Sequence, residues 1–324
     1  MKPRNHHPTE NTKPSSRKTF MVRRYDLAAT LTSGQAFRWQ WNHDAWEGMV
    51  ASSWVRLRSV SAGIEAETIV SESDWSWLSH YLQIDHDLEA VLATFPDDEP
   101  LRAAVEACHG LRLLRQDPWE CLASFILSSS KQIVQIQQII ACLCQKFGQP
   151  LPGPSTTAPA FAFPSPERIA QCSEAELRGC KMGFRAAYLR ATARMIAEGG
   201  IDLSRLDGLE LDEAREALMQ LPGVGRKIAD CVLLFALGYA RAFPMDVWVI
   251  KALRTLYFHG RPAPERFLRR FAEEHFGPYG GYAQQYLYHY MRIFKRNRAE
   301  AAPAGGRGEN GKEAVRQLNR AISV

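Results

Sequence analysis

The stretch LPGVGRKIADCVLLFALGYARAFPMDVWVI, residues 221–250, decides how this chain folds. Its glycines Gly223 and Gly225 predict a tight turn whose backbone N–H groups can approach a phosphate closely as a helix begins. We expect that helix to run from about Arg226 to Leu237 and to end at Gly238, because glycine is a common helix stop.

A lysine and an aspartate lie near the starts of two successive helices in this stretch. Lys227 falls in the first turn of the first helix, and Asp246 falls at the start of the next, after Pro244 and Met245. Two antiparallel helices would bring this amine and this carboxylate together. Taken alone, Lys227 is more simply explained as a surface residue paired with Asp230 three positions on, and Asp246 as a helix N-cap.

The composition fits a globular protein that meets nucleic acid through a local surface. The chain has 324 residues, 46% of them hydrophobic, which is enough for a substantial core and for two domains. Its formal net charge is +5 and its pI ≈ 8.8. Basic residues are concentrated in the first 24 positions, however, so the rest of the chain is close to neutral. A DNA-binding surface must therefore be a local arrangement of charge.

Two kinds of periodicity divide the chain. From Phe37 to Val70, apolar and polar residues alternate, which predicts an antiparallel sheet. After Asp74, apolar residues recur at three- and four-residue steps, which predicts helices, with a proline-rich loop over Gly148–Pro166. The fold class is therefore α+β, with an N-terminal antiparallel β-sheet domain followed by an all-helical core. The predicted divisions are a disordered basic arm over 1–19, the β domain with a helical end over 20–95, the helical domain over 96–297 and a flexible tail over 298–324.

Blocks spread over most of the chain resemble one known family. The hairpin, the Gly/Pro-containing loop and the aspartate are similar to those of the helix-hairpin-helix (HhH-GPD) DNA glycosylase superfamily. Within it, four further blocks, in the family's order, resemble 8-oxoguanine DNA glycosylase. They are TSGQAFRW (Thr32–Trp39), LRLLRQDPWECLASFILSS (Leu111–Ser129), MGFRAAYL (Met182–Leu189) and FGPYGGYAQQYLY (Phe276–Tyr288).

The resemblance gives Lys227 and Asp246 catalytic roles. Lys227 would attack the sugar carbon that carries the damaged base, which expels the base and leaves a Schiff base with the opened sugar. Removal of a proton from that adduct would then break the strand, an AP lyase reaction by β-elimination. Asp246 would stabilise the cationic sugar that develops as the base departs. The implied enzyme is a bifunctional DNA glycosylase and lyase.

The resemblance also implies a pocket for a base that has left the helical stack. Gly34 would accept, through its carbonyl, the hydrogen that oxidation adds at N7 of guanine. Cys231 and Tyr288 would sandwich the base, and Gln284 would bond its Watson–Crick edge. Most of the family has phenylalanine where this chain has Tyr288, so stacking is kept but the hydroxyl needs a partner. Taken alone, Gly34 is a turn glycine and Cys231 a core thiol.

The residues facing the opposite strand depart from the family's usual pattern. Ser130 stands where a larger residue would fill the space left by the base, and Gln135 replaces one of two arginines that read the opposite cytosine. Arg185 matches the second arginine, and Phe184 matches the aromatic wedge. We therefore expect weaker discrimination in favour of cytosine opposite the lesion than in stricter members.

The implied contacts to the DNA backbone come from Gly223, Val224 and Gly225, and Trp248 replaces a phosphate-contacting histidine. No metal is required, although the carbonyls of Leu221 and Val224 could hold a cation. No cofactor is implied. Some members of the superfamily bind an iron–sulfur cluster through four cysteines after the aspartate, and this chain has no cysteine after Cys231.

The expected partner is duplex DNA containing an oxidised guanine, with no membrane and no obligate protein partner. No signal peptide or membrane span is evident, so we expect an intracellular protein located with the DNA. Two alternatives stay open: a glycosylase of the same superfamily for alkylated purines or mismatched thymine or uracil, and a non-catalytic hairpin protein that only binds DNA. The set Gly34, Cys231 and Gln284 argues against the first, and Lys227 with Asp246 argues against the second.

Overall fold

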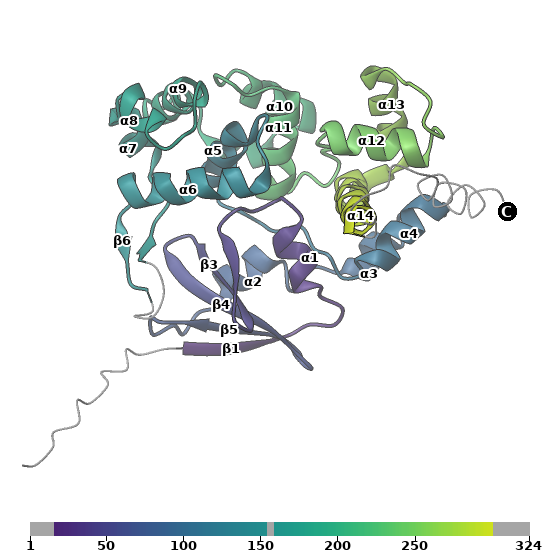
Figure 1. The fold of residues 1–324 in the computed structure, drawn as a ribbon, viewed down its shortest axis with the longest axis horizontal. Coiled ribbons are helices and arrows are strands. Elements are labelled where there is room, and N and C mark those ends of the chain that lie inside the picture. The colour runs from purple at the N-terminus through teal and green to yellow at the C-terminus, as the bar shows by residue number, and fades with distance from the viewer. Residues whose placement is uncertain (1–15, 154–158, 301–324) are drawn as a thin grey trace, which may run out of the picture.

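Five antiparallel strands near the N-terminus form one sheet in the order β1-β5-β4-β3-β2 (Figure 1). The structure, a computed structural model, describes residues 16–153 and 159–300. Along β5 buried and half-buried residues alternate, as expected for a sheet with one covered face. The predicted alternation between Phe37 and Val70 is thus confirmed. The strands are β1 (Ser16–Met21), β2 (Trp39–Asn42), β3 (Ala45–Val50), β4 (Ser53–Val60) and β5 (Gly63–Thr68).

The first strand begins earlier than the sequence predicts. Ser16 to Thr19, which the sequence assigns to the basic arm, lie in β1 and pair with β5, so that part of the prediction is wrong. Charge hid the strand: Arg17 is an edge-strand residue whose guanidinium contacts Glu67 at 3.3 Å. The rest of the predicted arm, 1–15, and most of the predicted tail, 301–324, lie outside the described residues, whereas 298–300 continue the last helix.

Helices α1 (Leu27–Thr32) and α2 (Ser76–Leu82) cover the inner face of the sheet. Their apolar residues pack with Leu57 and Ile64 of the sheet in the smaller of two hydrophobic cores. The sequence pattern did not predict α1, which is short and capped by the Asp26 carboxylate.

The larger core is formed mainly by the helical part of the chain, and Ala29 and Phe37 of the first part join it. At its centre α5 (Pro118–Ser128) has no exposed face, and residues 121–127 are all buried. The remaining helices are α3 (Leu88–Leu92), α4 (Glu99–Ala107), α6 (Ile133–Phe147), α7 (Pro166–Gln171), α8 (Glu174–Arg178), α9 (Arg185–Ala197), η1 (Leu203–Gly208), α10 (Leu211–Met219), α11 (Arg226–Val232), η2 (Leu233–Leu237), α12 (Val247–Leu256), α13 (Glu265–His275), η3 (Gly277–Tyr279) and α14 (Gly280–Glu300). In Figure 1, α6, α9, α10 and α11 lie around α5, whereas α12 and α13 lie to the right, and α14 returns beside α3 and α4.

The proline-rich loop over Gly148–Pro166 contains one small ladder. Strands β6 (Pro150–Leu151) and β7 (Ala160–Phe161) pair antiparallel, and residues 154–158 between them lie outside the described residues. The predicted division between residues 95 and 96 stays a prediction. Helix α3 precedes this point, and its residues Leu88 and Val91 already belong to the larger core.

The two parts of the chain meet along the turn after α1. The side-chain amide of Gln285 in α14 donates to the carbonyl of Ser33 at 2.9 Å, and the Tyr286 hydroxyl donates to the carbonyl of Leu111 at 3.0 Å. The Gln285 bond places the SGQ turn of the β-sheet part against α14, the last helix of the helical part.

Gly63 offers a test of the sheet. Its φ is +142°, and a Cβ there would lie 2.2 Å from the carbonyl oxygen of Phe20 in the neighbouring strand. We expect Gly63→Ala to lower the free energy of unfolding by about 3 kcal/mol, since both backbone strain and a backbone clash result. In urea unfolding, the control Gly208→Ala, whose Cβ would meet nothing within 4 Å, should change stability by less than about 0.5 kcal/mol. Equal losses in the two variants would contradict this account.

Candidate active site

The hairpin between α10 and α11 has the tight turn that the sequence predicts. Gly223 has a φ of +79°, and a Cβ on it would lie 2.7 Å from the Tyr188 side chain, so only glycine fits. Leu221 and Val224 are buried and anchor the turn, whereas Gly223 and Gly225 are exposed. The Val224 N–H donates to the carbonyl of Leu221 at 3.1 Å. The phosphate contacts of Gly223, Val224 and Gly225 stay predictions, and so does a cation at the carbonyls of Leu221 and Val224.

The helix after the hairpin spans the predicted residues. It runs as α11 and η2 from Arg226 to Leu237 and ends at Gly238, whose φ is +84°. Its last five residues widen into a π-turn, a local distortion that is frequent at functional sites. The carbonyl of Phe235 in that turn accepts the N–H of Gln116 at 2.8 Å, which ties the end of the helix to the segment before α5.

Lys227 lies inward rather than in a surface ion pair. Its Nζ is 4.8 Å from the centroid of the Phe125 ring on α5. Asp230, its alternative partner, is buried and bonds Arg215 instead, with Oδ1 2.6 Å from Nε. Cys231 lies one turn further along α11, and burial raises the pKa of its thiol to about 11 although Lys227 opposes the shift. Cys231 is therefore a neutral thiol at neutral pH.

Asp246 caps α12, as its simpler explanation requires. Its Oδ1 accepts the backbone N–H groups of Trp248 at 2.9 Å and Val249 at 2.8 Å. The cap fixes the carboxylate in place, and Asp246 also lines the same small cavity as Lys227. Capping and a catalytic charge are thus compatible at this position.

That cavity contains every residue predicted to bind the base. Its volume is ≈ 40 Å³, little more than the space one water molecule occupies in the liquid. The side-chain oxygen of Gln284 is buried there and has no hydrogen-bond partner among the described residues. Burial raises the pKa of the Tyr288 hydroxyl to about 12, with Arg292 opposing. The lining residues are Ser33, Gly34, Phe125, Lys227, Cys231, Phe235, Pro244, Asp246, Gln284, Gln285 and Tyr288.

Sequence reasoning missed Gln35, which holds the base-reading turn. Gln35 is fully buried, and its Nε2 donates to the carbonyls of Thr30 at 2.9 Å and Arg112 at 2.8 Å. Its Oε1 accepts the N–H of Leu114 at 2.8 Å. A buried amide with these partners fixes Gly34, whose φ is +78°. The only sequence signal was a polar residue between two small ones in SGQA.

The residues predicted to face the opposite strand gather at the ends of α5 and α9, with one exception. The Arg185 guanidinium donates to the carbonyls of Ser129 and Met182 and lies 4.4 Å from the centroid of the Phe184 ring, which is 56% exposed. Ser130, the residue after Ser129, is exposed and has a φ of +54°. Gln135 instead caps α6, since its Oε1 accepts the N–H of Gln132 at 3.2 Å.

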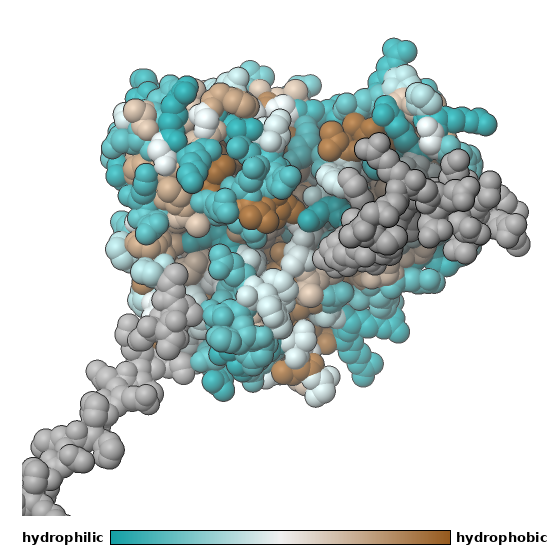
Figure 2. Space-filling model, viewed as in Figure 1, coloured by the Kyte–Doolittle hydropathy of each residue, from teal (hydrophilic) through white to brown (hydrophobic). Residues whose placement is uncertain are grey.

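Several exposed hydrophobic residues lie at or near the starts of helices. Val134 at the start of α6, Phe184 and Tyr188 on α9 and Val247 at the start of α12 are all at least 44% exposed. Figure 2 shows a mostly hydrophilic face that hydrophobic side chains interrupt near the middle. Trp248 is half-buried beside Val247, and its phosphate contact stays a prediction.

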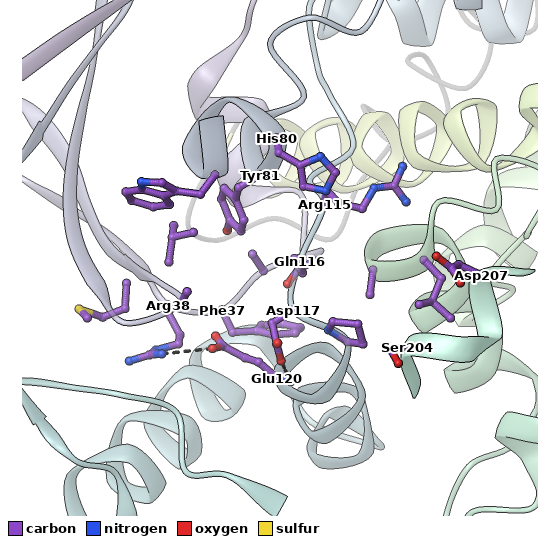
Figure 3. A pocket seen from close by; sticks show the side chains of 18 residues that line it. Phe37, Arg38, His80, Tyr81, Arg115, Gln116, Asp117, Glu120, Ser204 and Asp207 are labelled. Atoms are coloured by element: carbon purple, nitrogen blue, oxygen red, sulfur yellow. Dashed lines mark hydrogen bonds and ion pairs between the residues drawn. The ribbon is translucent and has the colours of Figure 1, made fainter. Parts of the chain in front are cut away.

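A larger hollow of ≈ 610 Å³ lies elsewhere, at the seam between the sheet and the helical part. In Figure 3 the Arg38 guanidinium points toward Glu120, with 3.2 Å between Nη1 and Oε2, while Tyr81 and Asp207 lie on other sides of the hollow. Neither Lys227 nor Asp246 lines this hollow, so size does not identify the reactive site.

Within the described ranges, no cluster of three or more His, Cys, Asp or Glu residues is placed to hold a metal ion. The seven cysteines are free thiols. No described helix combines the length and apolarity needed to cross a bilayer.

A helix-hairpin-helix that carries a lysine and an aspartate into one pocket defines a base excision DNA repair protein. The HhH-GPD superfamily of such proteins matches residues 123–275, and the N-terminal domain of 8-oxoguanine DNA glycosylase matches residues 19–122. The chain belongs to the 8-oxoguanine DNA glycosylase family of this superfamily.

Individual relatives agree. The N-glycosylase/DNA lyase of Arabidopsis thaliana is 33% identical over 81% of this chain and 76% of its own length. A probable N-glycosylase/DNA lyase of Methanothermobacter thermautotrophicus is 34% identical over 61% of this chain and 69% of its own. The Clostridium acetobutylicum 8-oxoguanine glycosylase/lyase, in complex with duplex DNA containing cytosine opposite 8-oxoguanine, has a TM-score of 0.78 at 31% identity and covers 84% of this chain and 93% of its own.

Substitutions of Asp246 separate its cap from its charge. Asparagine caps a helix as well as aspartate does, so Asp246→Asn should keep native stability while Asp246→Ala loses about 1 kcal/mol. Both should slow base release by about a hundredfold or more, because each removes the negative charge from the pocket. Single-turnover rates and thermal unfolding measure the two effects. Native rates in Asp246→Asn would reduce Asp246 to a cap.

Proposed function

We propose that this bifunctional glycosylase/lyase removes 8-oxoguanine from duplex DNA by an attack of Lys227, followed by cleavage of the strand. One observation carries the assignment of residues. The cavity that holds Lys227 and Asp246 is also lined by Gly34, Gln284 and Tyr288, which come from distant parts of the chain. Base-reading groups and reactive groups thus share one site.

The base must leave the duplex and enlarge this site before it can react. A cavity of ≈ 40 Å³ does not hold a purine. Flipping removes the base from the stack, and side chains around the cavity must then move apart. Phe184 supports the first step, since its exposed ring, with the Arg185 guanidinium over it, is suited to wedge into the duplex.

Two groups in the site match the hydrogen-bond donors of 8-oxoguanine. The buried oxygen of Gln284 lacks a donor, and the Watson–Crick edge of a guanine presents N–H donors. The Gly34 carbonyl would accept the N7 hydrogen, which unmodified guanine lacks. A guanine would leave that carbonyl opposite a lone pair, which is a penalty that favours the oxidised base.

The chemistry needs a neutral amine at Lys227 and a fixed negative charge at Asp246. The Nζ lone pair forms a bond to the anomeric sugar carbon while the glycosidic bond breaks and its electrons leave with the base, which takes up a proton. The C1′–O4′ bond then breaks as Nζ forms the C=N bond of the Schiff base, and the ring oxygen takes up the proton that the amine gives up. A water molecule takes a proton from C2′, its electrons form a C2′–C3′ double bond, and the C3′–O bond breaks so that the 3′ phosphate leaves. Asp246 stabilises the cationic sugar during the first step.

The surroundings of Lys227 suit this role. The Phe125 ring face stabilises a protonated amine less than an ion pair with a carboxylate would, and Asp230 bonds Arg215 instead. The Cys231 thiol, being neutral, does not pair with Lys227 as an anion.

We infer that the protein works inside the cell, where its DNA substrate is found.

Borohydride trapping tests the nucleophile. On a duplex with one 8-oxoguanine opposite cytosine, the native protein should form a covalent adduct, and Lys227→Gln should form none. The matched control Lys146→Gln, an exposed lysine on α6, should trap like the native protein. Base release without an adduct in the native protein would point to a water nucleophile and leave Lys227 a positioning residue.

Opposite-base preference tests the reading of the other strand. With Arg185 as the single arginine predicted to contact the opposite base, the protein should prefer cytosine over adenine by at most about a hundredfold, the factor for one arginine contact. Gln135→Arg should sharpen the preference, whereas Gln138→Arg, an equal charge on an exposed position of α6, should not. Single-turnover excision opposite C, A, G and T gives the ratios. A preference steeper than a thousandfold in the native protein would refute the account.

A further inference from the structure

Tyr288 closes the base pocket in the DNA-free protein. A Cβ placed on Gly34 would lie only 2.9 Å from the Tyr288 hydroxyl and 3.4 Å from the ring, so the ring reaches across the site to the base-reading turn. The space left between these walls is ≈ 40 Å³. A base that stacks on Tyr288 must therefore push this ring aside.

Arg292 holds the ring from one turn further along α14. Its guanidinium carbon lies 5.4 Å from the Tyr288 ring centroid, and its Nη1 donates to the carbonyl of Thr32 at 3.2 Å. One side chain thus links the aromatic ring on α14 to the segment that leads into Gly34. The link spans the seam between the two parts of the chain.

A second hollow adjoins the base pocket. This hollow of ≈ 340 Å³ is lined by Thr32, Ile133, Trp41 and Arg292, among others, but not by Lys227 or Asp246. Ile133 reaches to 3.2 Å from the Cβ position at Gly34, so this hollow and the base pocket meet at that glycine. Arg292 lines this second hollow and not the base pocket.

We propose that Arg292 is a positioning residue for base capture: it latches Tyr288 in the closed position, and a base enters the pocket only by displacing the ring against this contact. The inference rests on the proposed function and concerns the same site. The contact of Arg292 with Tyr288 adds a free-energy cost to the entry of any base and leaves the chemical step unchanged. A base that gains hydrogen bonds from Gly34 and Gln284 offsets this cost, and a base that gains fewer hydrogen bonds does not.

Equilibrium binding tests the latch in a Lys227→Gln background, where no base is lost. Two duplexes are compared, one with 8-oxoguanine opposite cytosine and one with a tetrahydrofuran abasic analogue, which has no base to insert. Arg292→Met should bind the 8-oxoguanine duplex about fivefold more tightly, the factor for losing one cation–π contact. It should bind the abasic duplex unchanged. Arg292→Lys, which keeps a cation over the ring, should stay near the parent value.

Two controls separate the latch from other roles. Arg102→Met removes one exposed charge on α4 and should change neither affinity. In a Tyr288→Ala background, Arg292→Met should have no further effect, because Arg292 acts through the ring. Equal weakening on both duplexes would make Arg292 a phosphate contact and overturn the proposal, as would an unchanged affinity for the 8-oxoguanine duplex. If Arg292 variants behave as expected only on undamaged guanine, or if the native protein releases no 8-oxoguanine, the proposed function fails instead.

Discussion

The packing of α11 against α5 is the contact on which the site depends. Phe125 of α5 stacks on Phe235 of η2 with ring centroids 5.7 Å apart, and the same Phe125 ring lies beneath the Lys227 amine. One buried aromatic side chain therefore supports the core and positions the nucleophile. On the other side of α11, the buried pair of Asp230 and Arg215 fixes its rotation about its own axis. Because the helix is held on both faces, Lys227 and Cys231 face the cavity together.

Local chemistry made part of this structure predictable. Glycine conformations, a helix stop at Gly238 and an aspartate cap at Asp246 are decided within a few residues, so the sequence predicts them well. The sheet and the helical core follow from periodicity. Strand β1 was missed because its pattern is charged and its partner β5 lies far along the chain. Gln35 was missed because its role depends on the carbonyl of Arg112, and the bond from Arg292 to the Thr32 carbonyl likewise joins segments that are distant in the chain, which no local pattern reveals.

The predicted site residues divide along the same line. The residues predicted for catalysis and base binding line one cavity, although they come from α11, the cap of α12, α14 and the turn after α1. On the opposite-strand side, Arg185 is held by the end of α5, but Gln135 serves the start of its own helix. Where the resemblance implies an arginine that reads the opposite base, this chain has an amide that stabilises the start of its own helix. Resemblance alone did not indicate this role.

The burial of Cys231 has a consequence for the conditions in which the protein works. Oxidised guanine forms where oxidants are present, and the same oxidants react with cysteine chiefly as the thiolate. Burial raises the pKa of Cys231 to about 11 and that of Cys144 to about 11, and raises that of Cys121 as well. These sulfur atoms therefore stay protonated and poorly reactive. The wall of this repair site therefore holds its sulfur in the protonated form, in which the oxidants that damage guanine attack it slowly.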